Sequence, residues 1–257
     1  MVVFLFAHPD DEFACSMWIR GLVRQGRRVT CAYLTDGGFG GQATARRESE
    51  SLRALAMLGV RAADVRFLGR EHGLRDGQLH SRLQDGWEVL MQWLDGLGEV
   101  QSIVVPAWEG GHQDHDAVHL LGVLAAAALG VEDVEQIPLY TGQGLPGPWF
   151  RVLAVLDSNG QAEFYRASPR ERLEAVFLCL SYISQWKTWL GLLPFFALHM
   201  LATGRFPRQR TSLERLRERP HPGPLLYERR GFLTYAEFRT RADHFMRSDA
   251  RARRFVT

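Results

Sequence analysis

Cysteine is scarce in this chain, and the few copies are scattered along it. There are three, Cys15, Cys31 and Cys179, and no CxxC pair is present. An odd and scattered set excludes a disulfide framework and is typical of a reducing compartment, so we expect a cytoplasmic protein. The composition, with 46% hydrophobic and 23% charged residues among 257, suits one compact unit, at the upper end of what a single core supports.

Long hydrophobic runs are also absent. The N-terminal run over 2–6 is too short for a signal peptide and has no basic segment before it, so we do not expect export. A second apolar stretch, 189–202, is shorter than the ~20 residues of a membrane span, and Pro194 interrupts it. We expect a core helix or a hydrophobic lid there. The alternative is an interfacial segment that rests on a membrane or grips a lipid-bearing substrate.

Charge of one sign does not dominate the chain. The formal net charge is +2 at pH 7, so we do not expect a nucleic-acid partner. Basic residues are denser over 215–223 and 247–254, and we expect both runs to be solvated surface. The glycine-rich turn over 36–41 lacks GxGxxG spacing and no lysine follows it, which excludes a nucleotide-binding P-loop.

The first 140 residues alternate between short apolar runs and helical patterns. The apolar runs predict strands over 2–6, 29–35, 65–69, 102–107 and 136–141. The helical patterns cover 9–25, 44–58, 80–97 and 114–128. Strands separated by helices in this way predict an α/β fold, in which helices flank a Rossmann-like, mostly parallel sheet.

The pattern changes after about residue 143. A linker-like turn over 145–150 is followed by a predicted strand over 151–157 and by a helix over 168–183 that Ser168 caps. We therefore divide the chain into an α/β core over 1–145 and a smaller C-terminal lobe over 146–257. This lobe either belongs to the same domain or forms a lid.

Three polar clusters begin where predicted strands end. They are HPDDE at 8–12, TDGGFGG at 35–41 and WEGGHQDHDAVH at 108–119. The carboxyl ends of parallel strands share one edge of a sheet, and ligands bind in the crevice at that edge. We therefore expect the three clusters to meet in one site.

The clusters contain the side chains of a hydrolytic metal site. His8 and Asp11 lie three residues apart at a helix start, and His112, Asp114 and His115 lie within one turn. Imidazole and carboxylate at this spacing indicate a divalent cation; the nitrogens favour zinc, although iron suits the same ligands. Three protein ligands leave a position for water, whose pKa zinc lowers to about 7. A spare carboxylate and a spare imidazole would complete the site, but these residues alone do not say which histidine is a ligand.

The other histidines are expected to be structural. His119 shares a helix face with His115 and could join the cluster, but we expect it to pack or to face solvent. His199 and His244 are isolated and are expected to be structural or exposed.

Taken together, these motifs resemble the PIG-L/LmbE-like deacetylases, zinc hydrolases that remove acetyl groups from N-acetylated amino sugars. The resemblance rests on AHPDDE at 7–12, TDGG at 35–38, RRESESLRALAMLG at 46–59 and HQDH at 112–115. It covers about the first 120 residues. The region beyond 145 shows no such resemblance; in this family it is variable and faces the substrate.

The resemblance implies a role for each polar residue. The metal ligands would be His8, Asp11 and His115, and the catalytic residues Asp10, His112 and Asp114. Asp10 would be the general base that deprotonates zinc-bound water. Protonated His112 would stabilise the oxyanion or protonate the amine, while Asp114 orients an imidazole. Activity would fall below about pH 6, where the ligand histidines take up protons.

The resemblance implies contacts with the sugar as well, but it leaves two candidates for one of them. Arg47 would lie near the sugar hydroxyls. Gln113 stands where the family usually has proline, and His72 stands where it often has an aspartate, with Asp76 four residues later. Either His72 or Asp76 could contact the sugar.

The expected function is zinc-dependent removal of the N-acetyl group from an N-acetylglucosamine-type sugar. The sugar could be free or carried on a lipid or polysaccharide, and we expect any membrane contact to be peripheral. One alternative is an amidase that acts on a larger acyl group. Another is a sugar-binding protein without turnover, but a binding module does not need the base Asp10 beside its metal.

Overall fold

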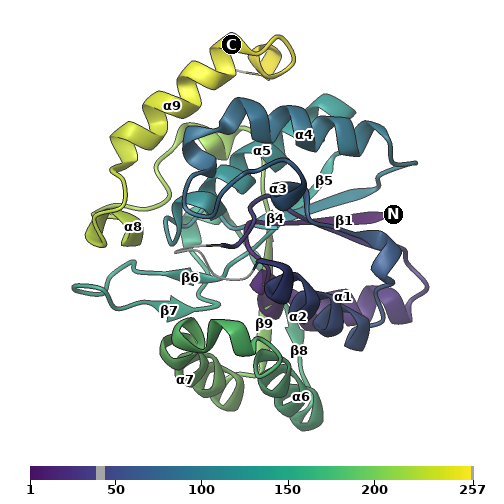
Figure 1. The fold of residues 1–257 in the computed structure, drawn as a ribbon. Helices are drawn as coiled ribbons and strands as arrows, with labels where there is room; N and C mark the ends of the chain where they lie inside the picture. The colour runs from purple at the N-terminus through teal and green to yellow at the C-terminus, as the bar shows by residue number, and fades with distance from the viewer. Residues whose placement is uncertain (39–43, 256–257) are drawn as a thin grey trace.

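A mostly parallel sheet forms the centre of the computed structural model, which describes residues 1–38 and 44–255; part of the predicted turn over 36–41 lies outside these residues (Figure 1). The strands, in their order across the seven-stranded sheet, are β3 (Val65–Arg66), β2 (Val29–Tyr33), β1 (Val2–Phe6), β4 (Ser102–Pro106), β5 (Asp133–Ile137), β9 (Arg205–Arg210) and β8 (Ala162–Arg166). Neighbours among the first five run parallel, whereas β9 is antiparallel to both β5 and β8. The predicted α/β class is confirmed.

Helices cover both faces of this sheet. They are α1 (Ser16–Arg24), α2 (Thr44–Met57), α3 (Leu68–Glu71), α4 (Leu83–Asp95), α5 (Gln113–Leu129), α6 (Pro169–Cys179), α7 (Trp186–Ala202), α8 (Leu226–Arg229) and α9 (Tyr235–Ser248). Short 3₁₀ helices are η1 (Asp11–Cys15), η2 (Ala62–Asp64), η3 (Leu79–Ser81), η4 (Asp157–Asn159), η5 (Ile183–Gln185), η6 (Glu214–Arg217) and η7 (Ala252–Phe255). Ser168 caps α6 as expected, accepting from the backbone of Glu171.

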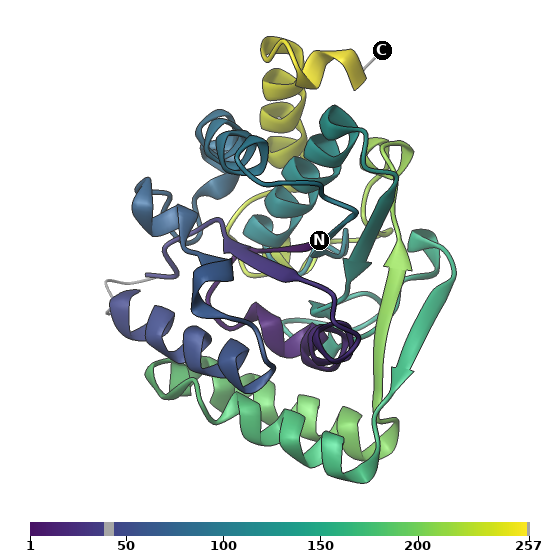
Figure 2. The same ribbon diagram turned by 90° about the vertical axis from the view of Figure 1, so that its right-hand side faces the viewer.

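Alternating side chains of β1 feed two separate cores. Val3 and Leu5 pack with α4, α5 and α9, whereas Phe4 and Phe6 pack with α1, α2, α6 and α7. Every residue of β1 is buried, as expected of a central parallel strand that is covered on both faces. Figure 1 shows the first group of helices above the sheet and the second below it, and Figure 2 shows α6 and α7 at the bottom, next to α2. Residues after 145 therefore contribute to both layers.

The site lies where the strand order reverses. From β1 the chain proceeds to β2 and β3 on one side, and from β4 it proceeds to β5 on the other. The loops that leave the carboxyl ends of β1 and β4 therefore diverge and leave a crevice between them. The polar clusters over 8–12 and 108–119 begin in these two loops.

The predicted fifth strand was placed too late in the chain. Instead of 136–141, β5 covers Asp133–Ile137, and β6 (Tyr140–Thr141) pairs with β7 (Arg151–Val152) in a separate hairpin. Pro138 has no N–H for the ladder, and the next two amides donate to the Glu109 carboxylate instead.

Two other predicted strands are shorter than expected. The strand over 151–157 ends at Val152, because Leu153 adopts a φ of 52° that no β-strand accommodates. The strand over 65–69 ends at Arg66, and α3 begins at Leu68. Gly69 lies against the backbone of Thr35, where a Cβ atom would approach to 2.1 Å, so this turn accepts only glycine.

The basic run over 215–223 is not simply solvated surface. Arg215 is buried, donates to Asn159 and to the Pro220 carbonyl, and joins η6 to the loop before β8. His221 is also buried. The apolar stretch over 189–202 lies within α7. Among the described residues, no helix has the length and apolar character needed to cross a membrane.

Candidate metal centre

The Asp11 carboxylate lies between two histidines. Its Oδ2 atom accepts from the backbone N–H groups of Ala7 and His8, each at 2.9 Å, which fixes the group at the end of β1. Its Oδ1 atom lies 3.1 Å from His115 Nε2 and 3.8 Å from His8 Nδ1. Burial alone would raise the pKa of Asp11, but the facing imidazoles of His115 and His8 outweigh burial and lower it well below its usual value.

These three side chains fit a divalent cation. One donor atom from each of His8, Asp11 and His115 lies within 4.8 Å of the other two, and all three residues are buried. In the part of the chain that the structure describes, His115 Nδ1 is buried without a hydrogen-bond partner. Two imidazole nitrogens and one carboxylate oxygen form a donor set that zinc accepts. The three expected ligands are thus brought together.

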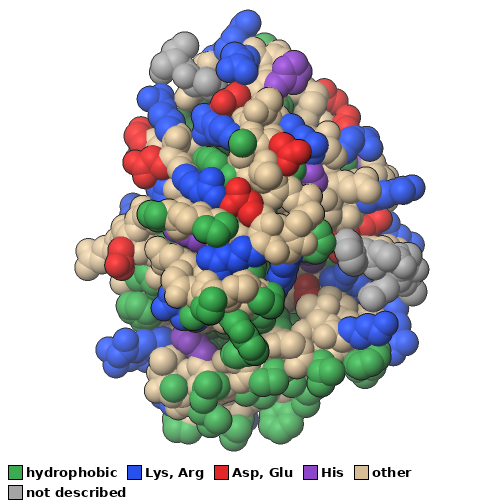
Figure 3. Space-filling view, turned by 90° about the vertical axis from the view of Figure 1, so that its left-hand side faces the viewer, with side chains coloured by type: hydrophobic (Ala, Val, Ile, Leu, Met, Phe, Trp, Pro, Cys, Tyr) green, Lys and Arg blue, Asp and Glu red, His purple; other side chains and the backbone are tan. Residues whose placement is uncertain are grey.

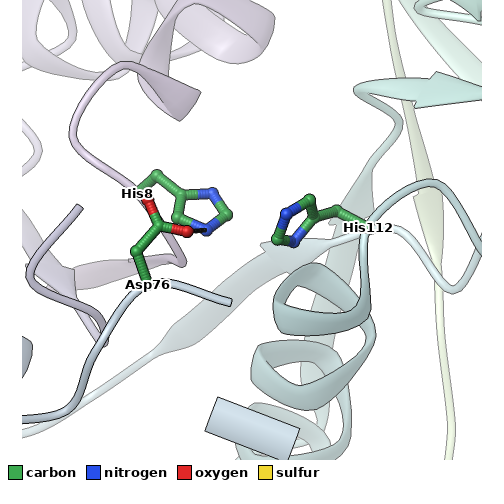
Figure 4. A group of neighbouring side chains, drawn as sticks. All are labelled: His8, Asp76 and His112. Carbon is green, nitrogen blue, oxygen red and sulfur yellow. Dashed lines mark ion pairs between the residues drawn. The ribbon is translucent and has the colours of Figure 1, made fainter. Parts of the chain in front are cut away.

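A second group of candidate ligands shares His8 with the first. His8, Asp76 and His112 also offer donor atoms within 4.8 Å of one another. Figure 4 shows the Asp76 carboxylate against the His8 ring, at 3.2 Å from Nε2, and His112 pointing toward the same ring from the far side. The ring centroids of His8 and His112 are 4.7 Å apart. The Nε2 atom of His8 thus faces Asp76, whereas its Nδ1 atom faces Asp11.

Asp114 lies behind His8. Its Oδ2 atom is 3.3 Å from His8 Nε2 and accepts from Gly77 N at 2.5 Å, while Oδ1 accepts from Leu79 N at 3.0 Å. The Asp114 side chain is fully buried at the start of α5. Burial lowers the pKa of His8, but the carboxylates around it, Asp76 foremost, raise it well above its ordinary value. A carboxylate in this position can fix the orientation of the His8 ring.

His112 caps α5 as a neutral imidazole. Its Nδ1 atom accepts from Asp114 N at 3.2 Å, so the proton of the ring is on Nε2. Burial and the nearby His8 lower the pKa of His112 to about 3. The ring lines the pocket described below and offers one N–H donor to it. This differs from the protonated form that the resemblance implied, because the capping bond occupies the second nitrogen.

Asp10 has a strained backbone. Its φ of 133° is rare for a residue with a side chain, and such strain occurs mostly at functional sites. The Asp10 N–H donates to Glu12 Oε2 at 3.0 Å. Burial raises the pKa of the Asp10 carboxyl well above its usual value, although Arg47 Nη2, 3.5 Å from Oδ1, opposes that rise. Asp10 also lines the pocket, together with the candidate ligands His8 and Asp11.

A residue from the C-terminal region completes the site, and sequence reasoning missed it. Gln185, in η5, donates from Nε2 to the Pro9 carbonyl at 2.6 Å and accepts from Arg47 Nη2 at 2.5 Å. Arg47 also donates to Pro9 O and lies 3.4 Å from Asp76 Oδ2. Gln185 lies 138 residues from Arg47, and no sequence pattern around it pointed to the site.

These groups line a pocket of about 260 Å³. Its polar part consists of His8, Asp10, Asp11, Arg47, Asp76, His112, Gln185, Thr188 and Arg230, and its apolar part of Phe13, Tyr140, Leu192 and Phe232. Most of the apolar part therefore comes from residues beyond 139. Figure 3, in which the left-hand side of Figure 1 faces the viewer, shows a hollow in the molecular surface.

Of the two candidate sugar contacts, only Asp76 lies at the pocket. Gly73 has a φ of 66° and turns the chain, so that Leu74 is buried and Asp76 reaches His8. Burial raises the pKa of Asp76, but His8 outweighs it and lowers the pKa well below its usual value. His72 is exposed and lines a different cavity, with Arg28 and Trp93.

The remaining histidines lie outside the site. His119 is buried, and its Nδ1 atom lies 2.7 Å from the Pro106 carbonyl oxygen, so it packs as expected. Burial lowers the pKa of His119 to about 3. His199 is half-buried against Arg205 O, and His244 is exposed.

A family model described as "PIG-L: GlcNAc-PI de-N-acetylase" matches residues 3–140, which span β1 to β6 and every candidate ligand. The chain belongs to the PIG-L family. The expectation drawn from the HPDDE and HQDH motifs is thus confirmed, and PIG-L membership supports a deacetylase. A comparison with curated proteins found no match.

Solved structures share the PIG-L fold. A deacetylase triple mutant of the teicoplanin biosynthetic pathway is 18% identical, with a TM-score of 0.61 over 82% of this chain and 98% of that one. A conserved protein from Thermus thermophilus is 19% identical, with a TM-score of 0.58 over 81% and 93%. N,N'-diacetylchitobiose deacetylase from Pyrococcus horikoshii is 15% identical, with a TM-score of 0.54 over 82% and 83%. At these identities the likeness establishes the fold alone.

Proposed function

We propose that this protein is a zinc-dependent N-deacetylase, which hydrolyses the acetamido group of an N-acetylated amino sugar or its conjugate in the cytoplasm. The observation that carries the proposal is the convergence of His8, Asp11 and His115 beside Asp10, whose backbone is strained. PIG-L membership supports the same chemistry.

His8, Asp11 and His115 would hold the cation, with Asp114 orienting the His8 ring. A bound zinc ion would lower the pKa of water and polarise the acyl oxygen; iron would suit the same ligands. The carboxylate of Asp11 is already bonded to two backbone N–H groups, so one ligand is fixed before the cation binds.

Asp10 would act as the general base. It removes a proton from water, and the hydroxide attacks the amide carbon. The buried setting raises the pKa of Asp10 and makes it a stronger base than a solvated carboxylate. When the C–N bond breaks, protonated Asp10 returns the proton to the leaving nitrogen. The products are acetate and a free amino sugar.

His112 would stabilise the charge that develops on the acyl oxygen. Its Nδ1 atom is occupied by the capping bond, so Nε2–H is the donor that it offers to the pocket. A fixed neutral donor of this kind is already oriented before the reaction and needs no proton from solvent.

Arg47 and Asp76 would hold the sugar hydroxyls, since both line the pocket within reach of each other. A cavity of about 260 Å³ is slightly smaller than typical ligand pockets, whose volumes start at about 300 Å³. We infer that it encloses one sugar unit and that the rest of a conjugate extends outward, past Phe232 and Leu192.

A second candidate reaction is hydrolysis of a larger acyl group. The apolar side chains Phe13, Leu192 and Phe232 in the pocket favour it, because an acyl chain would pack against them.

The two reactions are separated by one experiment. Zinc-loaded protein is incubated with N-acetylglucosamine, a lipid-linked N-acetylglucosamine and analogues with longer acyl chains, and released amine and acid are measured. We expect equal amounts of acetate and amine from an acetylated sugar, released far more slowly by Asp10→Asn. Faster release of a longer acid would favour the second candidate. Cation binding without amine release from any substrate would contradict both.

A further inference from the structure

Helices α6 and α7, with the segment between them, expose many apolar side chains. We name the surface that they form the α6–α7 face, and it consists of Leu173, Phe177, Leu180, Ile183, Trp186, Leu190, Leu198 and Leu201. Each of these side chains is more than half exposed, with Leu190 and Leu201 at 72%. Figure 3 shows hydrophobic side chains gathered at the lower end of the molecule, where Figure 1 places these helices. Large clustered apolar surfaces of this kind mark an interaction site.

The exposed residues of α7 in the α6–α7 face are distinct from the residues that α7 buries in the core. Trp189, Leu192, Phe196 and Met200 of α7 pack into the core below the sheet. Trp186, Leu190, Leu198 and Leu201 follow one another at multiples of three or four residues and form a second stripe, which faces outward. A helix that is apolar on both faces needs a second apolar environment besides its own core.

The α7 part of this face carries a positive charge and no acidic residue. Residues 175–204 contain no aspartate or glutamate, and Lys187 is the one lysine or arginine among them. The Lys187 ammonium lies over the Trp186 ring, at 5.8 Å from its centroid. In α6, Glu174 is paired with both Arg20 and Arg170, and Arg170 is 89% exposed. Trp, Phe and Leu with a basic rim are typical of segments that lie in the interface of an anionic bilayer.

The face is continuous with the candidate site. Thr188 and Leu192 of α7 line the pocket. Along the helix they alternate with the exposed residues Trp186 and Leu190 of the face. Gln185, directly before α7, contacts Arg47 and Pro9. A surface that covered the α6–α7 face would therefore lie next to the pocket.

We propose that the α6–α7 face docks on the surface of an anionic phospholipid bilayer, with its apolar side chains in the interface and Lys187 at the headgroups. A second copy of the chain fits the face less well, because residues 175–204 of the facing copy contain no aspartate or glutamate to pair with Lys187. The proposal does not depend on deacetylation, since bilayer binding is measured without substrate.

The test is co-sedimentation of the full chain with vesicles of phosphatidylcholine alone or with added phosphatidylglycerol. We expect binding to the anionic vesicles that weakens with salt. Leu190→Glu should weaken it about tenfold or more, because a charge replaces an inserted apolar side chain. Met57→Glu is the matched control: Met57 is 55% exposed on α2, outside the face, and this variant should bind like the native chain.

Circular dichroism and thermal unfolding establish that both variants are folded. Equal binding of Leu190→Glu and the native chain would overturn the proposal, as would absence of native binding to anionic vesicles. Sedimentation velocity identifies the competing occupant: an oligomer that Leu190→Glu dissociates, without vesicle binding by the native chain, would assign the face to a second copy.

Discussion

The backbone N–H of Asp10 donates to the carboxylate of Glu12 at 3.0 Å, across a single intervening residue. Glu12 is fully buried, and the bond accompanies the φ of 133° at Asp10. Burial raises the pKa of Glu12, and the hydroxyls of Tyr33, Ser51 and Tyr182 oppose that rise. Glu12 therefore holds the backbone of the proposed base.

Replacement of Glu12 tests this positioning role. Glu12→Ala should lower kcat about tenfold to a hundredfold, because a strained conformation worth about 1–3 kcal/mol loses its support. Glu12→Gln, which keeps an acceptor for the Asp10 N–H, should recover much of that loss. Steady-state kinetics on an acetylated sugar and zinc content measure the effect. Loss of zinc, or a change in KM alone, would indicate a different role.

Asp10→Asn should lower kcat by about 10²–10⁴, the usual contribution of a general base, and leave zinc binding intact. In the native protein the rate should fall as pH falls through the pKa of Asp10, because only the ionised carboxylate accepts a proton. Burial raises that pKa, so the acid limb should lie above the range of a solvated carboxyl. The pH dependence of kcat measures it. A flat profile down to ordinary carboxyl pKa values would contradict the assignment.

Glu109 should make stability depend on pH. It is fully buried, accepts from the Leu139 and Tyr140 amides, and burial raises its pKa to about 8. Unfolded glutamate has a pKa of about 4.3, so between these values the folded chain holds a proton that the unfolded chain has lost. The free energy of unfolding should therefore fall as pH rises, by up to about 1.4 kcal/mol per pH unit.

Glu109→Gln keeps the acceptor oxygen and removes the titration, so its free energy of unfolding should depend less steeply on pH. Urea unfolding of both proteins at several pH values, from mildly acidic to mildly alkaline, gives the difference between the two slopes. Identical slopes would show that Glu109 is ionised in the fold at neutral pH.

The part of the fold that could be predicted is the part with apolar strands. Val2–Phe6 and Ser102–Pro106 are uniformly buried, so an uninterrupted apolar run identifies them. β8 (AEFYR) and β9 (RFPRQR) are polar, and no residue of β8 is buried, as at the edge of a sheet. Their pairing depends on tertiary contacts that no local pattern encodes.

The candidate site also has a part that could be predicted from the sequence and a part that could not. His8 and Asp11 share one turn, and sheet topology brings the HQDH cluster to them, so spacing predicted that the clusters meet. The choice of His115 rather than His112 as the third ligand came from the family resemblance. Gln185 reaches the site through a contact at long sequence separation, which spacing cannot reveal. The choice between His72 and Asp76 depends on the turn at Gly73, whose positive φ decides which side chain faces the pocket.

The central claim is that His8, Asp11 and His115 hold the cation, rather than His8, Asp76 and His112. Zinc affinity of His115→Ala and His112→Ala, measured by competition with a chromogenic chelator, tests it most directly. We expect His115→Ala to lose zinc affinity by a large factor, and His112→Ala to keep near-native affinity while losing turnover. Native affinity in His115→Ala together with loss in His112→Ala would contradict the account.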